Sequence, residues 1–339
     1  METISKNRTI FMGIAIIWIM IYHIPALASL FPQPLFFLIK TGYAGVDIFL
    51  FLSSYGLYYS LKKDPSITRF YKKRFIRIFP TYFFAIIFFG LCNQLEITEI
   101  LKSLLLVGFY IPTLRWNSFD WYIPALIILY IIFPLIYKHI KGICKYFIFI
   151  FITNILLTFY ISDFLIKNEL NTSIILFLTR IPIFILGAIY AHYENDINKK
   201  IPTKTNIFLL IIGIVLLYNI NYFNDDNIKR YGLLFYPLIL IVPSFLTIIN
   251  KIPFQKYILL CSKLSFCGKY SLELYLIHWN LYNLRTYLNT NDRTIISIYL
   301  ILCFFISFPL ARYLNIIVNK IISHIEKKLL LSDKNFTKP

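Results

Sequence analysis

Ionisable side chains stand inside long apolar stretches of this chain, where they are costly to place. His23 lies in the first such stretch, IFMGIAIIWIMIYHIPALA, whose other titratable group is the Tyr22 phenol. An ionisable residue within a membrane segment commonly marks a functional site. A neutral imidazole accepts a proton near neutral pH, so His23 is a candidate general base. The alternative is a histidine that only forms a hydrogen bond across a helix interface.

The second apolar stretch carries a carboxylate, Asp47. A buried carboxylate needs a partner. We expect Asp47 to orient His23 and to stabilise its charge, as the acid of a catalytic triad does. The alternative is an ion pair with a membrane arginine such as Arg180. Gly42 and Gly45 precede Asp47 and allow a close helix approach or a local break.

The densest basic run separates the second and third apolar stretches, with seven basic residues between positions 62 and 77. Arg74 and Arg77 are three residues apart, so they share one face of a helix. Arginine forks suit phosphate oxygens. Together with Lys72 and Lys73, they predict a cytoplasmic binding mouth for a polyphosphate ligand. The alternative is that the run only sets the membrane topology.

Further polar residues gather near the end of the chain. Glu273, Tyr275 and His278 fall within two helical turns, with Tyr275 and His278 close to one face. Each could be a packing hydrogen bond, but three in one segment favour a ligand-binding role. Trp121 opens another apolar segment. There it would line the external entrance, or simply anchor the helix at the membrane interface.

The composition predicts that membrane helices position these residues. Of 339 residues, 58% are hydrophobic and 15% charged, and the mean hydropathy is +0.69. The net charge of +18 comes from short loops, so it indicates topology control and lipid contact, with no nucleic-acid partner. The five cysteines lack ligand spacing, and we expect no metal. Ten apolar segments are long enough to span a bilayer: 10–29, 36–61, 75–92, 121–138, 145–162, 173–192, 206–222, 231–249, 268–288 and 294–317.

The distribution of basic residues predicts the orientation. With the N-terminus inside, cytoplasmic loops and termini hold 24 of the 34 Lys and Arg residues and external segments hold eight. We therefore expect an all-α bundle of about ten transmembrane helices with both termini cytoplasmic, in a bacterial inner (plasma) membrane. The first segment is kept as an anchor, and 93–120 is an external loop with an interfacial helix. Residues 1–318 form one domain, and 319–339 form a frayed amphipathic tail.

Taken together, these stretches resemble the membrane acyltransferase-3 family of bacterial integral-membrane O-acyltransferases. The resemblance covers about residues 8–318 in matching order. It rests on five short motifs: Gly13 to His23, Gly45-Val-Asp-Ile-Phe with Leu52-Ser53, Arg74-Phe-Ile-Arg77-Ile-Phe-Pro80, Trp121 with Tyr130 and Pro134, and Ser271-Leu-Glu-Leu-Tyr-Leu-Ile-His278.

The resemblance implies an O-acyltransferase, with acetyl-CoA as a cytoplasmic co-substrate and no bound cofactor. The acceptor would be a hydroxyl of a cell-surface polysaccharide or its lipid-linked precursor. His23 matches the essential histidine of the family, and Tyr275 and His278 would bind the thioester carbonyl or the sugar. Met12 stands where relatives commonly carry an arginine, and Arg8 lies one turn earlier. The alternative function is a saccharide or lipid transporter (flippase) whose polar residues line a pathway.

Overall fold

The computed structural model describes residues 4–24, 31–106, 121–167, 173–222, 232–288 and 290–336. These residues form helices and no strand. The helices are α1 (Ile4–Tyr22), α3 (Leu35–Lys40), α4 (Ala44–Lys63), α5 (Ile67–Cys92), α6 (Ile97–Leu104), α7 (Tyr122–Lys138), α8 (Ile140–Lys145), α9 (Phe147–Lys167), α10 (Ser173–Leu178), α11 (Ile181–Lys200), α12 (Thr203–Tyr222), η4 (Leu233–Phe235), α14 (Leu238–Ile249), η5 (Phe254–Tyr257), α15 (Ile258–Lys269), α16 (Ser271–Asn283), η6 (Leu284–Leu288) and α17 (Arg293–Phe336).

The described helices include six spans that are long and apolar enough to cross a membrane. The ten-helix count and the cytoplasmic termini stay predictions. Large apolar side chains point outward from the peripheral helices α9, α12 and α17; Phe149, Phe208 and Phe305 are each more than 60% exposed. Such an apolar outer surface matches a bilayer rather than water.

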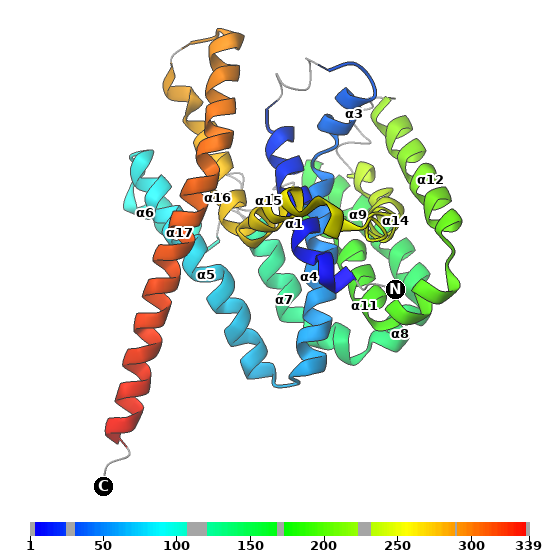
Figure 1. Cartoon of the computed structure of the whole chain (residues 1–339), viewed down its shortest axis with the longest axis horizontal. Coiled ribbons are helices and arrows are strands. Elements are labelled where there is room, and N and C mark those ends of the chain that lie inside the picture. Colours follow the sequence, from blue (N-terminus) through cyan, green and yellow to red (C-terminus); the bar gives the residue numbers. More distant parts are fainter. Residues whose placement is uncertain are drawn as a thin grey trace.

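Helix α1 lies at the centre of the bundle (Figure 1), packed against α4, α15 and α16. Helices α5, α16 and α17 lie on one side of it, and α11, α12 and α14 lie on the other. The buried Glu194 carboxylate of α11 fixes the start of α1. It accepts hydrogen bonds from the Ile4 N–H at 2.9 Å and from the Tyr55 and Tyr59 hydroxyls at 2.8 Å. Glu194 thereby satisfies one of the free N–H groups at a helix start.

Helix α15 crosses in front of α1 (Figure 1), in a region expected to be a loop between the segments 231–249 and 268–288. Two glycines allow the crossing. A Cβ atom on Gly13 would lie 1.9 Å from the Leu264 carbonyl oxygen, and one on Gly268 would lie 1.8 Å from that of Thr9. This helix was not predicted, because polar residues interrupt 250–267 and leave no apolar run long enough to span a membrane.

Several predicted spans are divided in the structure. The segment 36–61 consists of α3 and α4, separated by a turn at residues 41–43. Gly42 lets this turn pack closely on α1, because a Cβ there would collide with Trp18 and Tyr22. The segment 173–192 is likewise α10 and α11, and the regular helix of 231–249 begins only at Leu238. Part of 93–120 forms the short helix α6, while 107–120 lies outside the described residues.

Candidate functional site

Two histidines meet where α1 ends against α16. The His23 Nδ1 atom lies 3.1 Å from His278 Nε2, and His278 Nδ1 lies 2.8 Å from the Leu274 carbonyl oxygen. A carbonyl only accepts, so His278 donates from Nδ1, and the neutral ring then accepts at Nε2. His23 must therefore donate from Nδ1. The hydrogen-bond network thus assigns the lone pair of neutral His23 to Nε2.

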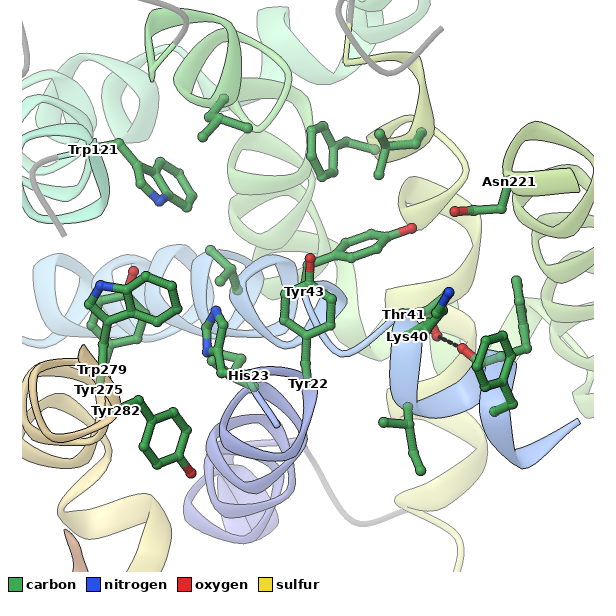
Figure 2. Close-up of a pocket in the computed structure, with 18 of the residues that line it drawn as sticks. Tyr22, His23, Lys40, Thr41, Tyr43, Trp121, Asn221, Tyr275, Trp279 and Tyr282 are labelled. Atoms are coloured by element: carbon green, nitrogen blue, oxygen red, sulfur yellow. Dashed lines mark hydrogen bonds between the residues drawn. The ribbon is translucent and has the colours of Figure 1, made fainter. Parts of the chain in front are cut away.

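His23 lines a cavity of about 870 Å³, a volume within the range of small-molecule sites. Aromatic rings surround the imidazole (Figure 2). The Trp279 ring lies 4.5 Å from the His23 ring, centre to centre, and Tyr275 lies 4.7 Å from Tyr122. Aromatic residues contribute ten of the lining side chains: Tyr22, Phe36, Phe37, Tyr43, Trp121, Tyr218, Phe235, Tyr275, Trp279 and Tyr282.

Asp47 is paired with Arg180, the alternative partner that the sequence left open. The Arg180 Nε atom lies 3.7 Å from Asp47 Oδ2, and both side chains are almost fully buried. The Arg180 guanidinium is held between two rings, 4.8 Å from Trp121 and 3.7 Å from Phe235. Because Arg180 lines the cavity, Asp47 fixes a cationic part of its wall.

Three arginines gather beside α4, near the other end of α1. The Arg8 Nε donates to the Leu52 carbonyl at 3.1 Å, and Arg74 donates to the Ser60 hydroxyl at 3.0 Å. Arg77 donates to the Lys269 carbonyl at 3.3 Å. The charges of Arg74 and Arg77 act on Arg8, so the three cations form one positive cluster. Arg8 lies one helical turn before Met12 on α1.

The loop between α4 and α5 holds part of the basic run in internal pairs. Asp64 lies 2.9 Å from Arg69 and 3.3 Å from Lys73. The Arg69 hydrogen bond, aided by the Ser66 N–H, lowers the pKa of Asp64 to about 2. Asp64 therefore stays charged near neutral pH and holds Lys73. Lys72 is exposed at the same turn.

Glu273 lies on the face of α16 that meets α17 and α5. Its Oε1 accepts from the Asn315 amide at 2.7 Å and lies 4.0 Å from Arg77 Nη1. The side chain is fully buried. Glu273 therefore connects the arginine cluster to the helix that carries Tyr275 and His278, rather than lining the cavity.

The cavity lining does not reach Arg8, Arg74 or Arg77. Helix α7 runs between the two regions. Its Tyr130 lies near Arg8 and Arg74, and its Tyr122 packs on Tyr275, which does line the cavity. Helix α7 and its tyrosines therefore connect the cavity to the three arginines.

Part of the site is not predictable from the sequence. Trp279 and Tyr43 were not proposed, because aromatic residues are frequent throughout this chain and carry no specific signal. Arg180 was noted only as a possible partner of Asp47, although an arginine inside a span is itself a signal. Within the described ranges, no group of three His, Cys, Asp or Glu residues is arranged to hold a metal.

A protein-family model described as "Acyltransferase domain" matches residues 12–312, which is nearly the whole chain. The matched range contains every site residue predicted from the sequence, including His23, His278, Arg74 and Arg77. Arg8 precedes the range. No curated protein and no solved structure matches the chain.

Proposed function

Since this chain belongs to the acyltransferase-domain family and is a multi-helix membrane acyltransferase, we propose that it is an O-acetyltransferase. It moves the acetyl group of acetyl-CoA from the cytoplasmic side of a bacterial inner membrane to a hydroxyl group. The acceptor is a cell-surface polysaccharide or its lipid-linked precursor. The observation that carries the proposal is the imidazole of His23, which lines a cavity of saccharide size and is oriented by His278.

The hydrogen-bond network supports a general-base role for His23. With Nδ1 donating to His278, the Nε2 lone pair is the atom that takes the proton of the acceptor hydroxyl. The oxygen then attacks the thioester carbonyl and forms the new ester bond while the C–S bond breaks. The His23 imidazolium returns its proton to the leaving thiolate. His278 acts here as a positioning residue, as the acid of a triad does.

The arginine cluster supports binding of the CoA phosphates. Arg8, Arg74 and Arg77 offer guanidinium groups beside the basic loop, with Lys72 at its surface. Arg8 and His23 are fifteen residues apart on α1, about 22 Å by the helical rise. An extended pantetheine arm has a similar length, so it would follow α7 past Tyr130 and Tyr122 to reach the cavity.

Asp47, Glu273 and Trp121 have supporting roles in this proposal. Asp47 holds Arg180, and Trp121 packs on the other side of that guanidinium, at the cavity wall. Glu273 links Arg77 to α16. All three would position groups that contact a substrate.

The test uses purified protein reconstituted in proteoliposomes, with radiolabelled acetyl-CoA and a cell-envelope polysaccharide extract. The wild type should transfer label to polysaccharide, and H23A should lose about a thousandfold in rate, within the range for removal of a general base. The matched control is H139A, because His139 is an exposed histidine at the end of α7 and outside the cavity. Flux of saccharide without any use of acetyl-CoA, or full activity in H23A, would contradict the proposal.

A further inference from the structure

The charged residues lining the cavity are all cations within the described part of the chain. They are Lys40, Arg180 and Arg285, and no Asp or Glu shares the lining. In the orientation expected from the sequence, Lys40 and Arg285 belong to the external side of the membrane. The external segments carry eight basic and eight acidic residues, so that side has no overall positive bias. Positive-inside topology therefore does not explain why the cations gather here.

Acidic residues of the same side are engaged elsewhere, where the structure describes them. Glu99 pairs with Lys102 at 2.6 Å, and Asp163 pairs with Lys167 at 2.7 Å. Asp292 accepts the Thr294 N–H at 2.7 Å, at the start of α17. None of these carboxylates reaches the cavity, so its cations keep only the Asp47–Arg180 pair as an internal counter-charge.

Arg180 is the deepest of the three cations. It is 2% exposed, and its Nε atom has no hydrogen-bond partner, because Asp47 stands at ion-pair rather than hydrogen-bond distance. The Trp279 Nε1 atom is a second buried donor without a partner. An unsatisfied buried donor costs free energy unless a ligand accepts from it. Both residues line the cavity, so its wall holds a positive charge and two donors that the protein itself leaves unsatisfied.

The rings of the lining determine what kind of anion fits. Tyr22 and Trp279 flank the imidazole, and Trp121 and Tyr275 belong to the same lining (Figure 2). Aromatic faces suit the apolar faces of a sugar ring. Lys40 and Arg285 are exposed residues of the lining, so they would meet a charge on a neighbouring sugar unit. We propose that the acceptor is an anionic saccharide, whose carboxylate or phosphate groups are recognised by Lys40, Arg285 and Arg180. This inference rests on the proposed acetyl transfer to a glycan.

Binding without any acyl donor tests this inference separately from catalysis. The full chain is placed in nanodiscs of neutral phosphatidylcholine, so that anionic lipid does not occupy the mouth. Two probe pairs are titrated while tryptophan fluorescence is followed, because Trp121 and Trp279 line the cavity. The first pair is trigalacturonic acid and its trimethyl ester. The second is maltotriose with and without one phosphate. The two arms distinguish a carboxylate from a phosphate.

We expect the charged member of at least one pair to bind about tenfold more tightly than its neutral partner. The double variant K40Q/R285Q should reduce this preference to about twofold. The matched control R293Q removes an exposed cation of the same side, outside the cavity, and should keep the full preference. Equal affinities within both pairs, an unchanged preference in the double variant, or binding of no probe would overturn the inference. A charge preference without any acetyl transfer would refute only the proposed reaction.

Discussion

His23 Nδ1 and His278 Nε2 lie 3.1 Å apart, although 255 residues separate them in the sequence. The contact brings the end of α1 against the middle of α16. Because His278 is itself held by the Leu274 carbonyl at 2.8 Å, one backbone oxygen determines the protonation pattern of both rings. The position of the Nε2 lone pair of His23 therefore depends on the packing of α16 as well as on α1.

The first prediction concerns His278 as the positioning residue. A glutamine at 278 retains an oxygen that accepts from His23 Nδ1, whereas a phenylalanine fills a similar volume without an acceptor. We expect H278F to lower kcat for acetyl transfer about a hundredfold, and H278Q to recover at least tenfold of that loss. Second-sphere partners of a reactive imidazole have effects of about this size. The measurement is kcat at saturating acetyl-CoA.

KM for acetyl-CoA serves as the internal control for the His278 variants. It should stay within about twofold of the wild type in both, since His278 forms its hydrogen bonds with His23 and Leu274. Arg77 instead contacts Glu273 and Lys269. Equal activity of H278Q and H278F would show that the ring only fills space. The His23–His278 hydrogen bond would then have no catalytic role.

A second prediction separates phosphate binding from the acetyl transfer itself. R77A should raise KM for acetyl-CoA about tenfold, by loss of a charge-assisted phosphate contact. Acetyl-pantetheine keeps the thioester but lacks the nucleotide phosphates, so its KM should not change in R77A. The matched control is R69A, because Arg69 is exposed and pairs with Asp64. A parallel rise for both donors would place Arg77 in helix packing rather than in phosphate recognition.

Much of the architecture was predictable from the sequence. Long apolar runs mark α5, α7, α9, α12 and α17, since burial in lipid needs only composition and length. The basic run at 62–77 and the histidine in the first segment were likewise visible as local signals. The breaks at residues 41–43 and 179–180 were not, because they depend on contacts with other helices.

The partners of the charged residues were harder to predict than their positions. Sequence reasoning favoured Asp47 as the support of His23, whereas the structure pairs Asp47 with Arg180 and His23 with His278. Either partner, His23 or Arg180, would give the buried Asp47 carboxylate a polar neighbour. Which of the two it meets depends on how α4 and α11 are rotated relative to α1. The α15 crossing is a similar case, because two glycines about 250 residues apart must meet.

A third prediction tests the glycine crossing of α1 and α15. G268A should destabilise the protein by about 3 kcal/mol or more, because its Cβ would meet the Thr9 carbonyl at 1.8 Å and neither backbone can yield easily. The matched control is G142A in α8, where a Cβ meets nothing within 4 Å. There the alanine should be neutral or stabilising by up to about 1 kcal/mol. Thermal unfolding in detergent measures both, and equal melting temperatures would mean that the helices do not cross this closely.

The last prediction tests the buried pair of Asp47 and Arg180. In D47N the Arg180 charge loses its counter-ion, and removal of one partner of a buried pair costs about 3–5 kcal/mol. R180Q leaves the carboxylate alone and should also destabilise the protein. The double variant D47N/R180Q removes both charges, so its loss should be smaller than the sum of the single losses by at least about 1 kcal/mol. Thermal unfolding of the four proteins completes this cycle. Strictly additive losses would mean that the two side chains do not stabilise each other, and would return Asp47 to consideration as a direct support of His23.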